Sequence, residues 1–257
     1  MKPYYVIDFI ATKCFIDIRV NDVSILCLNI DGTLSSVFPV NSAIVESGKQ
    51  QVSYNILPLL EETTLSDKVS FTASVWLYDA SGDLIEKKEE LNKFEMPKNK
   101  TGIPLPKYKG EDFFYAEVPY ILNAWQNSLD LSEIENLREL VDLAYKKIED
   151  IINTGNYEKL SELIQKREKN IATSLYLSEK EKNQRLKMFI EIVNMGFKVI
   201  PVTEKDTMII YGHDKLVMLK NEEGKSALLL MNENTGEELN LEFQFHLENE
   251  NEELTII

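Results

Sequence analysis

The chain contains two histidines, His213 and His246, and these are the first residues to consider for chemistry. His246 alternates with the aromatic residues of the segment Phe243–Leu247, as residues along a strand do. Two such histidines and a carboxylate could bind a metal ion or transfer a proton. Their spacing matches no metal-binding motif, and a single histidine in a strand is more often a hydrogen-bonded structural residue. We therefore predict no metal site and no cofactor.

Cys14 and Cys27 are the only thiols, and both lie in apolar, strand-like segments. A cysteine nucleophile needs a base or another feature that lowers its pKa, and neither cysteine lies at the start of a predicted helix. The chain also contains no G-x-S-x-G motif, P-loop or G-x-G-x-x-G motif. We expect no catalytic residue. For the two thiols, burial as small hydrophobic side chains and a disulfide across a hairpin both remain open.

The chain is acidic, with 43 acidic and 28 basic residues and a formal net charge of −15. The segment from Asn221 to Glu253 concentrates this charge, since its glutamates are accompanied by a single basic residue, Lys225. Fixed negative charge repels nucleic-acid phosphates and anionic membrane surfaces, so we expect neither as a partner. A basic protein is the partner that the charge permits. The alternative is that the glutamates lie in solvated loops and serve solubility.

We predict that a partner-binding surface would combine glutamates of this segment with exposed aromatic residues, because aromatic anchors supply much of the energy of an interface. The candidate residues are Glu222, Glu223, Glu248, Glu250, Trp125 and Tyr108. The segment Met96–Gly110 is rich in proline and glycine and is locally basic, which predicts a long loop. This loop is either a contact site or a solvated connection.

Residues 1 to 125 are predicted to form an antiparallel β-sandwich. Segments such as Cys14–Val20 and Val69–Leu77 alternate apolar and polar residues, which is typical of strands. Turn dipeptides separate them, and we predict hairpin turns at Asn21–Asp22 and at Asp31–Gly32, where a type I′ turn needs positive φ. No helical period intervenes between these strands, which favours a sandwich.

Residues 126 to 257 are predicted to form an α+β domain. Ser132 with Glu135, and Ser178 with Glu181, have the spacing of capping boxes that begin helices. A further helix is predicted to begin at Asn156, and the third to end at Gly196. Short apolar segments separated by turns follow, which predicts an antiparallel meander covered on one face by the three helices. The whole chain is thus predicted to be α+β, with an N-terminal β-sandwich followed by a helical segment packed on a C-terminal antiparallel sheet.

The N-terminal segment has Asp8 within its apolar stretch and is not followed by a cleavage site, so we predict no secretory signal. No apolar stretch approaches the length of a membrane span. These features favour a cytoplasmic protein.

Three segments carry a resemblance to a known class of proteins: Ile210–Val217, Ser226–Leu228 and the closing Leu254–Ile257. With these segments, and with a β-sandwich followed by an α+β domain, the chain resembles uncharacterised bacterial two-domain proteins of the toxin-immunity type. The resemblance covers part of the chain and supplies no functional residue. It implies a cytoplasmic protein that binds and blocks a secreted antibacterial toxin.

Three functions follow from these patterns. The first is a non-enzymatic protein-binding module, in particular an immunity protein that neutralises a toxin. The second is a small-ligand-binding or enzymatic α+β domain with a pocket under the C-terminal sheet, similar in its order of elements to nuclear transport factor 2-like domains. The third is a structural adaptor whose two domains dock different partners.

Overall fold

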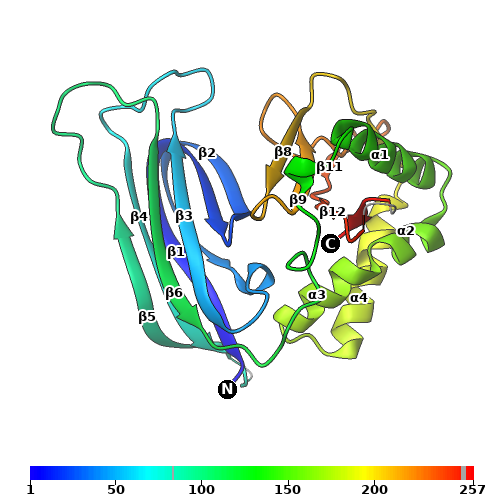
Figure 1. The fold of residues 1–257 in the computed structure, drawn as a ribbon, viewed down its shortest axis with the longest axis horizontal. Coiled ribbons are helices and arrows are strands. Elements are labelled where there is room, and N and C mark those ends of the chain that lie inside the picture. The colour runs from blue at the N-terminus through cyan, green and yellow to red at the C-terminus, as the bar shows by residue number, and fades with distance from the viewer. Residues whose placement is uncertain (83, 250–252) are drawn as a thin grey trace. The chain divides into compact units, whose positions relative to one another are not determined.

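The computed structural model describes residues 1–82, 84–249 and 253–257. The chain forms two compact units, Met1–Leu122 and Asn123–Ile257, whose elements are labelled in Figure 1. The boundary predicted from the sequence lies three residues later, after residue 125. Strands dominate the first unit, while helices followed by short antiparallel strands make up the second. The predicted α+β class is confirmed.

The first unit is one antiparallel sheet of six strands. They are β1 Pro3–Val20, β2 Val23–Pro39, β3 Gly48–Leu57, β4 Ser70–Asp79, β5 Glu86–Glu95 and β6 Tyr108–Ala116, with a short 3-10 turn, η1, at Asn41–Ala43. The order is β5-β4-β1-β3-β6, and β2 pairs with β1. Strand β1 pairs with β4 through residues 3–12 and with β3 through residues 15–20, so β3 and β4 follow one another along it.

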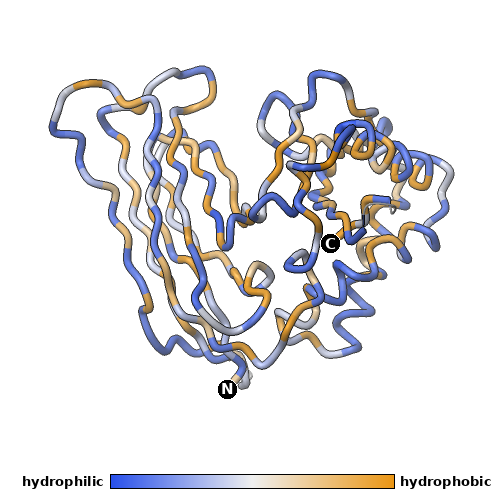
Figure 2. The backbone as a smooth tube through the Cα atoms, in the orientation of Figure 1, coloured by the Kyte–Doolittle hydropathy of each residue, from blue (hydrophilic) through white to orange (hydrophobic). Residues whose placement is uncertain are grey.

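A bulge interrupts the pairing of β1 with β2 at Lys13, in the middle of β1, where φ is 51°. The fully buried residues of β1 have odd numbers before this point, as in Phe9, and even numbers after it, as in Ile16. Lys13 thus changes the phase of the alternation and keeps both halves of β1 facing the same core. Figure 2 shows hydrophobic and hydrophilic residues alternating along these strands.

Aromatic rings from both halves of the curled sheet meet in its core. The ring of Tyr54 on β3 lies 5.3 Å from that of Phe71 on β4 and 4.8 Å from that of Phe94 on β5. Gly110 on β6 makes room for Phe94, since a Cβ at that position would lie 2.2 Å from the ring. The strands predicted as a sandwich therefore enclose a core between the two halves of one sheet.

The two predicted hairpin turns have different outcomes. Asn21 and Asp22 join β1 to β2 with φ values of 51° and 61°, as a type I′ turn requires. The turn predicted at Asp31–Gly32 is wrong, because these residues lie inside β2 at a bulge opposite Lys13, where Asp31 forms an ion pair with Lys13. Both dipeptides suit a turn locally, and the long pairing of β1 with β2 determines which one is used.

The second unit begins with a 3-10 turn, η2 Leu131–Glu133, followed by four helices: α1 Leu137–Asn153, α2 Tyr157–Leu163, α3 Gln165–Ser174 and α4 Glu179–Val193. The capping box at Ser178 and Glu181 is confirmed. The one at Ser132 is wrong, because the Asp130 carboxylate accepts from the Ser132 backbone N–H at 3.0 Å and the chain forms η2 there instead. The second predicted helix is two helices, α2 and α3, which meet at Ile164.

Two small antiparallel sheets replace the single predicted meander of the second unit. One contains β7 Phe197–Val199, β10 Leu229–Asn232 and β11 Glu238–Asn240, in the order β11-β10-β7. The other contains β8 Thr207–Tyr211, β9 Leu216–Lys220, β12 Phe245–His246 and β13 Thr255–Ile256, in the order β13-β12-β9-β8.

Helix α1 packs on the four-stranded sheet, as predicted for the helical segment. The ring of Tyr145 lies 5.2 Å from that of Phe245, and its hydroxyl accepts from the Leu219 backbone N–H at 2.8 Å. Among the described residues, no helix is both long and apolar enough to span a bilayer.

Candidate functional site

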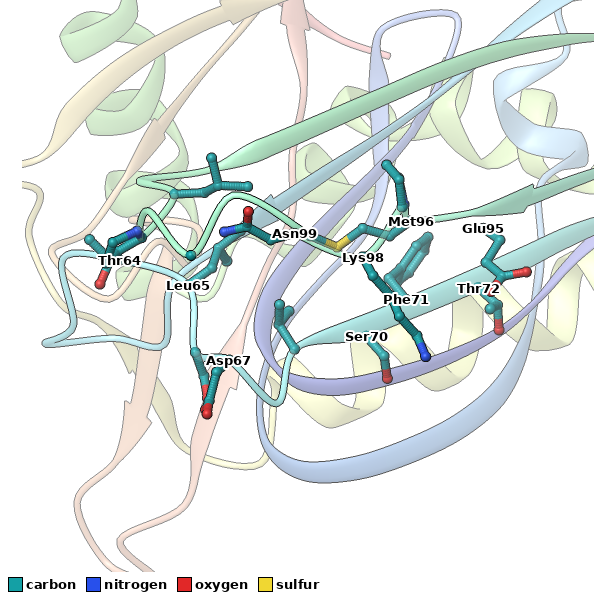
Figure 3. A pocket seen from close by; sticks show the side chains of 16 residues that line it. Thr64, Leu65, Asp67, Ser70, Phe71, Thr72, Glu95, Met96, Lys98 and Asn99 are labelled. Carbon is teal, nitrogen blue, oxygen red and sulfur yellow. The ribbon is translucent and has the colours of Figure 1, made fainter.

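A candidate site is a cavity of about 530 Å³ in the first unit, between the connection from β3 to β4 and the connection from β5 to β6. Figure 3 shows its lining, which comes from residues 64–72 and 95–105. Its volume falls within the range of about 300–1,000 Å³ that is usual for ligand sites. The second of these connections is the basic, proline-rich loop that the sequence predicted. We call this site the loop cavity.

Backbone hydrogen bonds hold the two walls of the loop cavity together. The N–H of Leu65 donates to the carbonyl of Leu105 at 2.7 Å, and the N–H of Met96 donates to the carbonyl of Phe71 at 2.9 Å. Asn99 orders the tip of the second wall, since its side-chain amide donates to the Ile103 carbonyl at 2.7 Å. The cavity is therefore bounded by chain segments that are fixed to one another.

The floor of the loop cavity is apolar. Leu65, Phe71 and Met96 line it and are buried. Phe71 also packs against Tyr54 and Phe94 in the core of the sheet, so the floor is part of that core. A close-packed floor of this kind suits an apolar group, because it keeps its shape when the group binds.

The rim of the loop cavity is polar and exposed, and its charged and amide residues are Asp67, Glu95, Lys98 and Asn99. In Figure 3 the amino group of Lys98 extends toward the hydroxyl of Ser70, and Asp67 lies on the other side of the cavity. Within the described parts of the chain, Lys98 forms no ion pair with a carboxylate. The lining residues include no histidine or cysteine. The arrangement suits binding of an apolar group flanked by polar or charged ones.

The predicted acidic residues do not gather at one place. Glu222 and Glu223 lie in the turn after β9, where Glu223 pairs with Lys225 at 2.6 Å. Glu248 follows β12, which runs antiparallel to β9 with Phe245 opposite Val217. This register places Glu248 toward the start of β9, at the opposite end of the strand from Glu222. Glu250 lies outside the described residues.

Neither predicted aromatic anchor offers a freely exposed ring. Trp125 is only 7% exposed. Tyr108 is half-buried, with its ring 6.3 Å from that of Phe94. The exposed aromatic residues of the same strand are Phe113 and Tyr115, which flank the buried Phe114. The period-2 alternation of β6 was the signal that could have identified them.

His246 is fully buried and is hydrogen-bonded at both ring nitrogens. Nδ1 lies 2.7 Å from Ser128 Oγ, and Nε2 lies 3.3 Å from Lys166 Nζ. An ammonium group only donates, so Nε2 accepts from Lys166 and Nδ1 carries the proton that is donated to Ser128. In this tautomer His246 cannot take a proton from Ser128 through Nδ1. The pair is therefore a structural contact and not a nucleophile with its base.

The surroundings of His246 keep it neutral. Burial and, to a smaller extent, the positive charge of Lys166 lower its pKa to about 4, and the charge of Glu248 opposes this shift. Lys166 in turn forms an ion pair with Glu248. Both of these residues line a second hollow, of about 310 Å³, formed by α1, α2, α3 and the strands β12 and β13.

The other residues considered for chemistry lie apart from these hollows. Cys14 and Cys27 are not joined in a disulfide, and burial raises the pKa of Cys14 to about 11, which opposes thiolate formation. His213 lies exposed in the turn between β8 and β9, with a φ of 56°. In the described part of the chain, no three side chains of the types His, Cys, Asp and Glu are grouped so as to hold a metal ion.

Comparisons of the chain with protein-family models, with curated proteins and with solved structures found no match.

Proposed function

We propose that this chain is a non-enzymatic protein-binding module that takes a segment of a partner protein into the loop cavity. The observation that carries this proposal is the combination of an apolar floor with an exposed, charged rim in a cavity of about 530 Å³. An apolar side chain of the partner would lie on Leu65, Phe71 and Met96. Such central, desolvated anchors supply most of the binding energy of protein interfaces.

The rim supports a partner segment that is polar around its apolar anchor. Lys98 could pair with a carboxylate of the segment, and Asp67 and Glu95 with basic groups. Hydrogen bonds and charge pairs at a rim select between partners and exclude water from the anchor. The net charge of −15 would speed the approach of a partner that is basic overall.

The toxin-immunity role is a specific case of this proposal, in which the partner is an antibacterial toxin. In that case cells that lack the gene should become sensitive to a toxin encoded beside it, and the gene with Lys98→Glu should restore resistance less well than the natural gene. Unchanged sensitivity after deletion would contradict the immunity role, and would leave the binding test below to decide the more general proposal.

The direct test is a peptide-display selection on the purified protein, followed by binding measurements with the selected peptides. We expect selected peptides to shift the amide NMR signals of Leu65, Met96 and Leu105. Lys98→Glu should weaken the binding of peptides that contain a carboxylate by about tenfold, because an attractive charge becomes a repulsive one.

Lys107→Glu is the matched control. Lys107 lies on the same exposed loop, undergoes the same change of charge and does not line the cavity. We expect it to change peptide affinity by less than about twofold, since exposed charges outside the contact are screened. Selection of no peptide, or equal effects of the two substitutions, would refute docking at the loop cavity.

A small-ligand function is the second candidate, and the hollow of about 310 Å³ in the second unit favours it. It lies against the four-stranded sheet and presents the Lys166–Glu248 pair, which could recognise a polar group. A fragment screen by NMR tests it. Binding there should shift the amide signals of Leu163 and Thr255 and leave Leu65 unchanged, and a screen in which no fragment does so speaks against this site.

A further inference from the structure

Strand β2 forms an open edge of the first unit. It spans 17 residues, Val23–Pro39, and pairs with β1 and with no other strand of the described residues. Bulges interrupt its pairing at Ile25 and at Asp31–Gly32, which leaves Thr33–Pro39 as its longest regular stretch. An open edge presents backbone N–H and C=O groups that can pair with another strand.

One hydrogen bond identifies which backbone groups face the open side. The N–H of Val40 donates to the carbonyl of Tyr5, so the backbone groups of Tyr5 and Val40 face each other, as in a hydrogen-bonded pair, although the Tyr5 N–H donates to Asn41 Oδ1. Such pairs alternate along an antiparallel ladder with pairs whose backbone groups point away from each other. Counting along the register from Tyr5, the backbone groups of Thr33, Ser35 and Val37 point away from β1. The side chain of Val37 at this edge is 51% exposed.

The charge on β2 differs from that on the edge strand β5. Seven of the ten residues of β5 are charged, and charged side chains are a usual means of preventing edge-to-edge pairing. Strand β2 carries a single charged residue, Asp31, which is paired with Lys13. The stretch Thr33–Pro39 carries none. The edge formed by β2 therefore lacks the protection by charge that β5 has.

We propose that β2 pairs with β2 of a second copy of this chain, antiparallel and about a two-fold axis. Two copies with a net charge of −15 repel each other, so they would approach most readily along an uncharged strip, and Thr33–Pro39 is such a strip. A two-fold contact uses the same patch on both copies and closes the assembly at a dimer.

The stretch is also self-complementary when Ser36 of one copy lies opposite Ser36 of the other. Ser35 then lies opposite Val37, and these are the residues whose backbone groups face outward. Leu34 lies opposite Phe38, on the face of the sheet that carries the buried Phe9. In this register the outward-facing backbone groups of the two copies can form hydrogen bonds with each other, and the apolar side chains of Leu34 and Phe38 lie side by side.

The dimer should be weak and reversible. A pair of strands of this length buries less surface than the roughly 1,600 Å² of a standard interface. We expect a dissociation constant of about 10–100 µM, which is in keeping with an interface smaller than the standard size. Sedimentation of the full chain from about 1 to 500 µM should show the mass rising from one chain toward two.

Ser35→Pro and Val37→Lys test the contact without disturbing β1. Proline at position 35 removes an N–H that faces the second copy, and lysine at position 37 places two like charges at the contact. Both variants should remain monomers at every concentration, and circular dichroism should show that they are folded. Tyr115→Lys is the matched control, because Tyr115 is 74% exposed on the edge strand β6.

The control should dimerise as the natural protein does. A natural protein that stays a one-chain species throughout the range would overturn the proposal, as would both variants of β2 dimerising normally. Neither result bears on peptide binding at the loop cavity, since no residue of β2 lines it.

Discussion

The two units differ in what they do with their polar groups. The first unit leaves several of them without partners in the described chain: the edge of β2, the Lys98 side chain at the loop cavity and the buried hydroxyl of Tyr54. The second unit also has such an atom among its described residues, Asn240 Oδ1, but its buried charge, Glu168, is paired with two arginines. The comparison agrees with the proposal that the first unit binds the partner, and it makes the charge pairs of the second unit a test of how much they contribute to stability.

Glu168 on α3 shows how the second unit pairs its charges. It is buried, and its carboxylate accepts from Arg167 and, at 2.7 Å, from Arg185 on α4. Burial lowers the pKa of the Arg167 guanidinium, so this cation depends on the carboxylate beside it. His246 is neutral, and both of its ring nitrogens have partners within the second unit, Ser128 and Lys166.

The largest effect expected from this comparison is on Glu168. Glu168→Gln leaves buried positive charge without its counter-charge, which typically costs about 3 kcal/mol. We expect a loss of this size in the unfolding free energy of the second unit, measured by urea unfolding of the full chain. Glu191→Gln is the control, since Glu191 is exposed and its pair with Lys187 at 3.5 Å is worth less than about 1 kcal/mol. Equal losses of unfolding free energy in the two variants would contradict the view that the buried charge pair at Glu168 contributes more than an exposed one.

The next effect is a pH dependence that arises from His246. Its pKa in the folded protein is about 4, below the ordinary value of 6.5, so between these values the unfolded chain binds more protons. Stability should therefore fall as the pH decreases from about 6.5 to about 4, by on the order of 2 kcal/mol after solvent screening.

His246→Gln should remove this part of the pH dependence, measured as unfolding free energy against pH. His213→Gln, at the exposed turn, should keep it. Carboxylates with lowered pKa values, such as Glu248, also lose stabilising interactions in acid, so the informative quantity is the difference between the variants and the natural protein. If the natural protein and both variants lost the same unfolding free energy between pH 6.5 and pH 4, the low pKa of His246 would make no contribution to the pH dependence.

The smallest effect concerns the first unit. The Tyr54 hydroxyl is buried, and no hydrogen-bond partner for it is found in the described parts of the chain. Tyr54→Phe removes this unsatisfied group and keeps the ring packed against Phe71 and Phe94. We expect the unfolding free energy to rise by about 1 kcal/mol. A loss of stability would mean that the hydroxyl has a partner, and would weaken the contrast between the two units.

Several elements could be predicted from the sequence because their causes are local. The turn at Asn21–Asp22 needs only two residues that tolerate positive φ, and the start of α4 needs only the reciprocal bonds of Ser178 and Glu181. The errors occurred where a distant or neighbouring group competed. The Asp130 carboxylate accepts from the Ser132 backbone N–H, so Ser132 does not begin a helix. Asp31 and Gly32 lie within the long pairing of β1 with β2, so they form a bulge and not a hairpin turn.

The candidate site could be predicted only in part. For the basic loop Met96–Gly110 the sequence leaves a contact site and a solvated connection open, and residues 96–105 of this loop lie along one wall of the loop cavity. The other wall, from Thr64 to Thr72, was missed because nothing in its composition signals that it faces that loop. The two walls meet because β4 pairs with β5 and because Leu65 bonds to Leu105.

Alternation, helical period and capping act over a few residues, so the α+β class and the positions of most helices and strands follow from the amino-acid sequence, as does the charge. Long-range strand pairing is needed to form one curled sheet from the N-terminal strands, to leave β2 at its edge and to bring two loops together around a cavity. It also decided that Glu222 and Glu248 lie at opposite ends of β9. These outcomes depend on which strands pair and in what register, and register is set by contacts between residues far apart in the chain.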